Sequence, residues 1–169
     1  GVYKVGREVE KMSKSKYNVV SPDAICEQYG ADSLRLYEMF LGPLEQSKPW
    51  NTAGITGTHG FLKKLWKLYF NESGPVFKSE PASAAQLKIL HKTIKKVTED
   101  IENFSFNTSV STFMICVNEL AALQCASQEI LEALAILVSP YAPHIAEELW
   151  EAMGHEESIS TAPFPVFNP

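Results

Sequence analysis

The sequence predicts an all-α fold, a helical bundle preceded by a polar loop and short connecting helices. Beyond about residue 52, apolar residues recur at intervals of three and four over several long segments. Short breaks containing Pro, Gly, Ser or Asn separate these segments. Four or five amphipathic helices of this length, joined by short breaks, form a bundle.

The region before the bundle is predicted to contain a loop and two short helices. Residues 1–20 are polar with a lysine cluster, and we expect a loop that ends in β conformation. Ser21 as N-cap and Pro22 at the first helical position predict a helix that Gly30 ends. A second short helix is expected over residues 32–41.

Five helices are predicted for the bundle. They span about residues 52–70, 83–103, 107–124, 127–138 and 143–153. The third is apolar on most sides, so we expect it at the centre. In the first, Trp66 is assigned to a core stripe formed by Ile55, Leu62, Trp66 and Tyr69, and the nearby Phe61 is assigned to the core as well. Residues 158–169 hold three prolines and are predicted to be an extended tail whose partner is absent.

Composition excludes several classes of protein. No uncharged apolar run approaches the roughly 20 residues of a membrane span, and no leader opens the chain, so we predict a cytoplasmic protein without a membrane partner. Cys26, Cys116 and Cys125 are odd in number and lie in apolar helical patterns, so we expect buried free thiols. His144 has no second ligand at metal spacing, and no metal site is expected.

The charge is unevenly distributed along the chain. Residues 1–96 contain all 15 Lys and Arg and 9 Asp and Glu, a net charge of +6. Residues 97–169 contain no basic residue and 11 acidic ones, a net charge of −11. Phosphate binding needs local lysine or arginine, so any contact with nucleic acid is expected from the first part.

The sharpest motif is the string Lys11-Met12-Ser13-Lys14-Ser15. A given five-residue string occurs by chance in a chain of this size at odds of roughly one in ten thousand. Two ammonium groups and two hydroxyls on a mobile loop can close over a triphosphate. They can then neutralise the charge that builds on departing pyrophosphate.

KMSKS is the second signature of class I aminoacyl-tRNA synthetases, and the residues after it extend the resemblance. The chain resembles bacterial leucyl-tRNA synthetases in KMSKSKYNVVSPDAICEQYGADSLRLYEMFLGP, Trp50 and GITGTHGFLKKLWKLYF. Two later segments, FNTSVSTFMICVNEL and LVSPYAPHIAEELW, resemble bundle segments of the leucyl, valyl and isoleucyl group. The resemblance covers essentially the whole chain and implies a bundle of the anticodon-binding-domain type.

The resemblance implies roles for the loop. Lys14 is expected to contact the ATP phosphates with help from Lys11, beside Met12, Ser13 and Ser15. The implied reaction is attack of the leucine carboxylate on the α-phosphorus of ATP, followed by transfer of leucine to the 3′-terminal ribose of tRNA(Leu). ATP would act with Mg²⁺ in a parent enzyme that is monomeric.

Two positions depart from the family pattern and two others follow it. Tyr17 stands where the family more often has Gly or Asn, and Gly60 stands where it often has Arg. Asn18 and Asp32 fall on family-like positions, but capping or turn formation explains them equally well.

The chain is expected to be a fragment, since it opens without Met and lacks a nucleotide-binding sheet. Residues 1–50 would end the catalytic domain, 51–155 would form the tRNA-binding bundle, and 156–169 would lead to a missing domain. We expect this fragment alone to bind no cofactor and to be catalytically inactive. The candidate tRNA contacts are the lysine faces of two helices, Lys63, Lys64, Lys67, Lys88, Lys92, Lys95 and Lys96.

Two alternatives remain open at this point. The chain could come from a valyl- or isoleucyl-tRNA synthetase, although the stretch from Met39-Phe40 to Trp50 favours the leucyl type. It could also be a non-catalytic helical interaction module with an incidental KMSKS loop. Solvated lysines on the outer face of a bundle are common, so the lysine faces alone do not decide.

Overall fold

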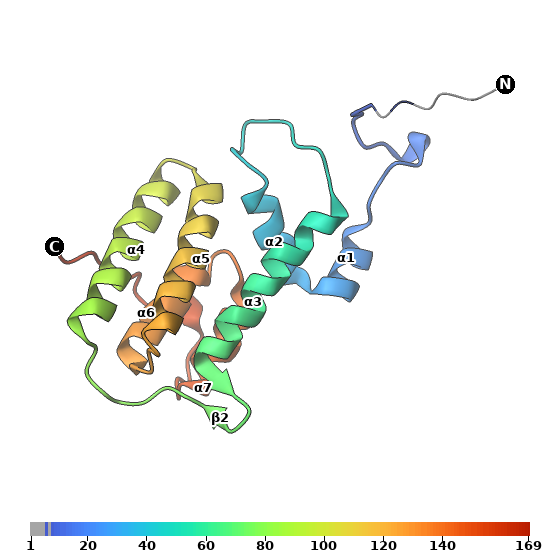
Figure 1. Cartoon of the computed structure of the whole chain (residues 1–169). Coiled ribbons are helices and arrows are strands. Elements are labelled where there is room, and N and C mark those ends of the chain that lie inside the picture. The colour runs from blue at the N-terminus through green and yellow to red at the C-terminus, as the bar shows by residue number, and fades with distance from the viewer. Residues whose placement is uncertain (1–5, 7) are drawn as a thin grey trace.

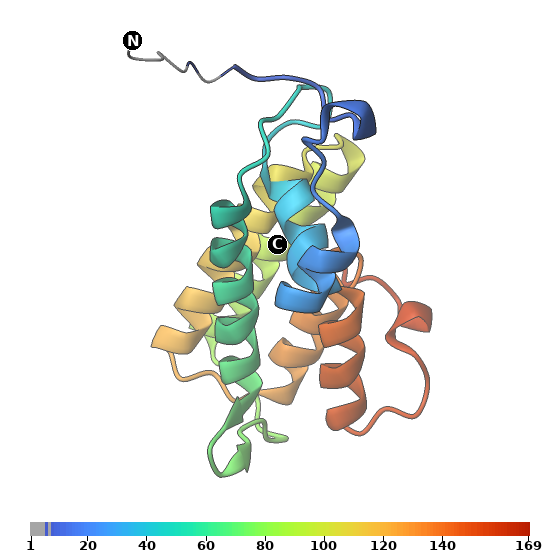
Figure 2. The same ribbon diagram turned by 90° about the vertical axis from the view of Figure 1, so that its right-hand side faces the viewer.

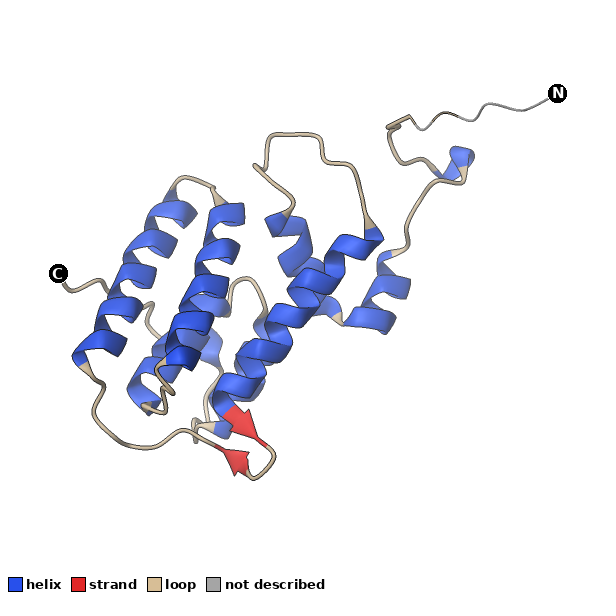
Figure 3. Cartoon of the chain, viewed as in Figure 1, coloured by secondary structure: helices blue, strands red, loops and turns tan. Residues whose placement is uncertain are grey.

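The computed structural model describes residue 6 and residues 8–169 and confirms the predicted all-α helical bundle (Figure 1, Figure 3). Its α-helices are α1 (Pro22–Tyr29), α2 (Ala31–Phe40), α3 (Ile55–Tyr69), α4 (Ala84–Glu102), α5 (Phe106–Ala122), α6 (Gln128–Val138) and α7 (Pro143–Ala152). Short 3₁₀ turns cover Lys14–Lys16, Thr52–Gly54 and Ile159–Thr161. A hairpin that the sequence did not predict joins β1 (Phe70–Asn71) to β2 (Gly74–Pro75) after α3.

Three helices pack against α5. Helix α5 contacts α2, α3 and α4, while α6 packs against α4 and α7. In Figure 1, α4 and α3 lie on either side of α5, and Figure 2 shows the N-terminal loop leading away from the bundle beyond α1. Helix α2 contacts both α3 and α7, so the segment that follows the loop is packed onto the bundle.

Local sequence explains where the helices begin and end. The Ser83 hydroxyl accepts a hydrogen bond from the Gln86 N–H, and the Gln86 side chain accepts one from the Ser83 N–H, which forms a capping box at the start of α4. Gly30 separates α1 from α2 with a φ of 85°, a conformation that glycine adopts without steric cost. The helix ends lie within two residues of the predicted ones, except that α3 begins at Ile55, three residues after its predicted start.

One large apolar core holds the bundle together. Its fully buried members include Phe113, Leu120, Leu134 and Leu137, each of which contributes roughly 1.5–3 kcal/mol on burial. The buried Tyr69 hydroxyl donates a 2.7 Å hydrogen bond to the Leu131 carbonyl. A second, smaller cluster contains Ile25, Tyr37 and Ile55 at the junction with α1 and α2.

The cysteines follow the prediction in part. Cys116 and Cys125 are buried free thiols as expected, whereas Cys26 is only half-buried. Burial raises the pKa of the Cys116 thiol to about 11, so this thiol stays protonated at neutral pH.

The predicted core stripe of α3 is wrong at one position. Trp66 is 38% exposed and stacks on Phe70, with ring centroids 4.5 Å apart. Ile55, Phe61 and Tyr69 are buried as predicted. Leu65, one position before Trp66, is buried in its place, so the indole lies at the edge of the buried face.

The C-terminal tail is irregular but has a partner within the chain. The Phe167 ring packs edge-on against His91 of α4, and the Lys95 ammonium lies 5.6 Å from the centre of the Phe167 ring. The Asn168 N–H donates to His91 Nδ1 over 3.2 Å. The tail therefore covers part of the lysine face of α4.

Within the described residues, none of the helices is both long and apolar enough to cross a bilayer.

Candidate functional site

The KMSKS string lies on an exposed loop outside the bundle. Lys14 begins a 3₁₀ turn, and the hydroxyls of Ser13 and Ser15 lie 2.8 Å apart in a hydrogen bond. The neighbouring Lys16 forms a 3.0 Å ion pair with Glu10. Within residue 6 and residues 8–169, the ammonium groups of Lys11 and Lys14 have no acidic partner, so both can meet an external anion.

Asn18 holds the two ends of the string together. Its side-chain Oδ1 accepts a 2.8 Å hydrogen bond from the Ser13 N–H, and its Nδ2 donates to the Lys11 carbonyl over 3.4 Å. One amide therefore fixes the backbone on both sides of Met12. From the sequence, turn formation explained Asn18 as well as a chemical role did. The two hydrogen bonds show that the Asn18 side chain stabilises the turn.

Tyr17 forms the exit of the loop in a left-handed conformation. Its φ is 52°, and its side chain is 95% exposed. This region of backbone conformation suits Gly and Asn, which have the lowest cost there. The left-handed backbone at position 17 accounts for the Gly or Asn that the resemblance leads one to expect there.

Helix α2 forms hydrogen bonds with the start of α7 and with the connection between α6 and α7. The buried Asp32 carboxylate accepts hydrogen bonds from the N–H groups of His144 and Ile145, at 3.3 and 2.7 Å, and from His144 Nδ1 at 2.8 Å. One turn later, Arg35 donates to the carbonyls of Pro140 and Tyr141. An anion thus lies at the N-terminus of α7, as the helix dipole favours, while Arg35 binds the carbonyls of the connection between α6 and α7.

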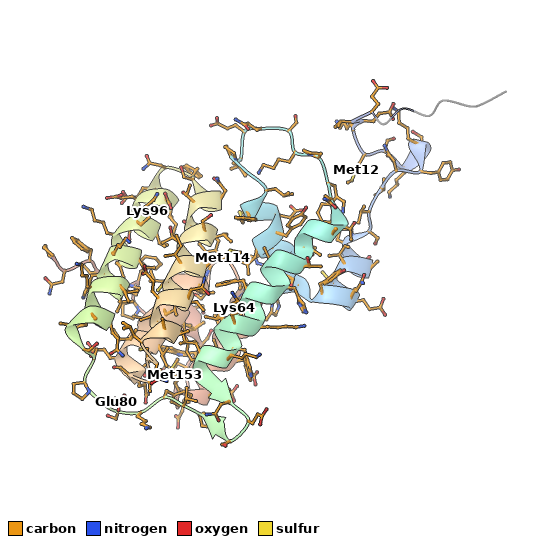
Figure 4. The ribbon with its side chains drawn as sticks, in the orientation of Figure 1. Met12, Lys64, Glu80, Lys96, Met114 and Met153 are labelled. Carbon is orange, nitrogen blue, oxygen red and sulfur yellow. The ribbon has the colours of Figure 1, made fainter. Side chains whose placement is uncertain are left out.

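The candidate lysines on the bundle are exposed, but they differ in their surroundings. Helix α3 carries Lys63, Lys64 and Lys67 with no acidic residue between Ile55 and Tyr69. On α4, Lys96 pairs with the buried Asp100, and Lys95 lies over Phe167. Figure 4 shows Lys64 and Lys96 on separate helices, and Met12 apart from both. The structure therefore does not join the loop and the lysine faces into one cluster.

Comparison with known families matches both parts of the chain. The family described as anticodon-binding domain of tRNA ligase matches residues 84–169. The family described as tRNA synthetases class I (I, L, M and V) matches residues 5–49.

Individual proteins give a narrower assignment. A leucine–tRNA ligase of Christiangramia forsetii is 73% identical over 167 residues, which are 99% of this chain and 17% of that protein. A leucine–tRNA ligase of Bacteroides thetaiotaomicron is 59% identical over 169 residues, covering 99% of this chain and 18% of that protein. Such relatives do not favour the valyl, isoleucyl or interaction-module alternatives.

A solved structure agrees with these relatives. The crystal structure of a ternary complex of Agrobacterium radiobacter K84 agnB2 LeuRS, tRNA and LeuAMS is similar with a TM-score of 0.79 and 28% sequence identity. The likeness covers 94% of this chain and 22% of that one.

The chain spans less than a fifth of the length of the two curated relatives named above. It belongs to the leucine–tRNA ligase family, and it corresponds to the segment that contains the KMSKS loop and the anticodon-binding-type bundle.

Proposed function

We propose that this chain supplies two surfaces to a leucine–tRNA ligase, an ATP-contacting loop and a tRNA-contacting bundle. The complete enzyme would activate leucine with ATP and Mg²⁺ and transfer it to tRNA(Leu), as a monomer in the cytoplasm. Residues 1–50 would belong to its catalytic domain, 51–155 to the bundle, and 156–169 would lead onward. The chain alone would not catalyse the reaction, because the rest of the ATP site lies elsewhere.

The proposal rests on two lysines of the loop that have no acidic partner among the described residues. Lys11 and Lys14 have exposed ammonium groups without an acidic partner in the described part of the chain, whereas Lys16 beside them is paired with Glu10. Unpaired cations on a loop that projects from the bundle can approach the phosphates of ATP. We therefore assign ATP contact to Lys11, Ser13, Lys14 and Ser15, with Met12 between them.

The tRNA surface is assigned chiefly to α3. Its three lysines have no acidic residue beside them on the same helix, whereas α4 also carries Glu99, Asp100 and Glu102. RNA phosphates are attracted by the local charge, and neighbouring carboxylates reduce it. Lys63, Lys64 and Lys67 are thus expected to contribute more than Lys88, Lys92, Lys95 and Lys96.

Charge-matched variants test this assignment in a full-length chimera, in which this chain replaces the 167 matching residues of the C. forsetii ligase. Changing Lys63, Lys64 and Lys67 together to Gln is expected to weaken tRNA(Leu) binding at least about ten-fold at low salt. The slope of log K against log salt should fall by about 2, since each phosphate contact contributes roughly 0.7–0.9. Filter binding at several salt concentrations measures both quantities.

The control changes Lys88, Lys92 and Lys95 to Gln, which removes the same charge from α4. We expect less than a three-fold loss of tRNA affinity for this control. Equal losses in the two triple variants would show that the net charge of the bundle matters and that α3 holds no special contact.

Asn18 gives a second prediction, on the shape of the loop. In the chimera, Asn18→Ala removes both hydrogen bonds that hold Ser13 and Lys11 together. We expect leucine-dependent pyrophosphate exchange to slow by up to about 30-fold, since two hydrogen bonds of about 1 kcal/mol each are lost and about 1.4 kcal/mol is a factor of ten.

Asn18→Asp is a second variant for this prediction. Asp retains an acceptor for the Ser13 N–H but cannot donate to the Lys11 carbonyl, and its charge repels that carbonyl and the ATP phosphates, so its rate should also fall below that of the wild type. A rate for Asn18→Ala within two-fold of the wild type would contradict the role given to the two contacts.

A further inference from the structure

A groove runs along α3 where that helix faces the α1–α2 junction and the start of α7. It has a volume of about 560 Å³, and Tyr29, His59, Lys63, Trp66, Lys67 and His144 are among the residues that line it. We call it the α3 groove. Its volume lies within the range of sites that bind small molecules, and a single nucleotide has this scale.

The charge of the α3 groove suits an anion. Lys63 and Lys67 lie one helical turn apart on one wall. Asp32 is the acidic residue among those that line it, and it is only 7% exposed because its oxygens accept the hydrogen bonds of α7. The two exposed ammonium groups therefore dominate the field at the mouth of the groove.

The hydrogen bonds of His59 fix which of its nitrogens can meet a ligand. The Ser33 hydroxyl has a single proton, and its 2.7 Å contact with the Tyr29 carbonyl must use that proton, since a carbonyl only accepts. The Ser33 oxygen therefore accepts from His59 Nδ1–H over 3.1 Å. In the neutral ring, His59 Nε2 is then an acceptor, and it has no partner among the described residues.

Trp66 adds an aromatic surface. One face of the indole stacks on Phe70, at an interplanar angle of 13°, and the side chain is still 38% exposed. An exposed indole beside two lysines combines the two elements by which proteins hold unpaired nucleotides, an aromatic platform and a cationic track for the backbone. A base-paired nucleotide could not use this platform, because both faces of its base are stacked within the helix.

We propose that the α3 groove binds one unpaired nucleotide of the tRNA. Its base stacks on Trp66 and donates an N–H to His59 Nε2, and its phosphate lies between Lys63 and Lys67. The inference rests on the proposed contact between the bundle and tRNA, and it adds the class of nucleotide and the residues that recognise it.

The test is the binding of tRNA(Leu) to the chimera with Trp66→Leu. Leu keeps an apolar side chain beside Phe70 but removes the stacking surface. We expect about ten-fold weaker binding with an unchanged salt slope, because base stacking releases no counterions. The matched control is Trp150→Leu on α7, where the indole stacks on His155 away from the groove, and it should bind tRNA as the wild type does. Circular dichroism and thermal melting confirm that each variant is folded.

His59→Phe and photocrosslinking give readouts that do not depend on Trp66→Leu being folded. Phe keeps an aromatic ring but removes the acceptor, and we expect about five-fold weaker binding, since one hydrogen bond is lost. With tRNA that carries 4-thiouridine, we expect crosslinks from unpaired positions to the peptide that contains Trp66.

The outcomes separate this inference from the proposed function. Wild-type affinity of both Trp66→Leu and His59→Phe, with weak binding by the α3 lysine variant, would overturn the nucleotide site and leave the tRNA surface in place. Crosslinks to this peptide from base-paired positions alone would also overturn it. Wild-type affinity of the lysine variant as well would overturn the tRNA surface itself.

Discussion

Lys14→Ala in the chimeric ligase is expected to slow leucine-dependent pyrophosphate exchange by about 10²–10³-fold, the cost of removing one preorganised group that stabilises transition-state charge. The Lys14 ammonium has no acidic partner in the described residues and lies on the exposed loop, so nothing within this part of the chain competes for it. Lys14→Ala therefore removes an interaction that stabilises the charge developing on pyrophosphate. Pyrophosphate exchange at saturating leucine and ATP measures this rate directly.

Lys16→Ala is the control for Lys14→Ala. The two side chains are two residues apart on the same turn, but Lys16 is paired with Glu10. We expect Lys16→Ala to change the exchange rate by less than three-fold, and both variants to bind tRNA(Leu) as the wild type does. A rate for Lys14→Ala within three-fold of the wild type would refute the assignment of Lys14 to the ATP phosphates.

The elements predicted well from the sequence are those whose ends are set by neighbouring residues. The capping box of Ser83 and Gln86 starts α4, and Pro22 lies at the first position of α1. These interactions span at most three residues, so a single sequence contains all the information that they need. The KMSKS string was recognisable for the same reason, because its chemistry lies in five consecutive residues.

The features that were missed depend on contacts between distant segments. Periodicity places Trp66 in the core as readily as Leu65, and only the packing of α3 on its neighbours selects Leu65. The hairpin after α3 is too short to show alternation. Trp66 was not predicted as a binding residue, because an aromatic residue at helical spacing is usually part of the core.

The contact of Asp32 with α7 is another long-range feature, since His144 is 112 residues away in the chain. As a residue at the start of a short helix, Asp32 was expected to cap or turn locally. The N-cap of its own helix is Gly30, and the carboxylate instead accepts the N–H groups that begin α7. Sequence shows that an Asp can cap a helix, but tertiary structure decides which helix.

Asp32→Ala is expected to lower the free energy of unfolding of the 169-residue chain by about 3 kcal/mol, since hydrogen bonds to a charged group contribute about 1.5–3 kcal/mol and loss of the helix-dipole partner adds about 0.3–1 kcal/mol. The carboxylate is buried and accepts three hydrogen bonds. Asp32→Asn keeps one acceptor and should lose about half as much stability. Urea denaturation followed by circular dichroism measures each difference.

Asp23→Ala is the control for this prediction, because Asp23 is an exposed carboxylate in the first turn of α1. Substitutions at such positions usually change stability by less than about 0.5 kcal/mol. A loss for Asp32→Ala as small as that for Asp23→Ala would mean that water replaces the carboxylate at the start of α7. Since Asp32 and Arg35 both join α2 to the α6–α7 connection, a large loss would instead show that this connection holds the segment after the KMSKS loop in place on the bundle.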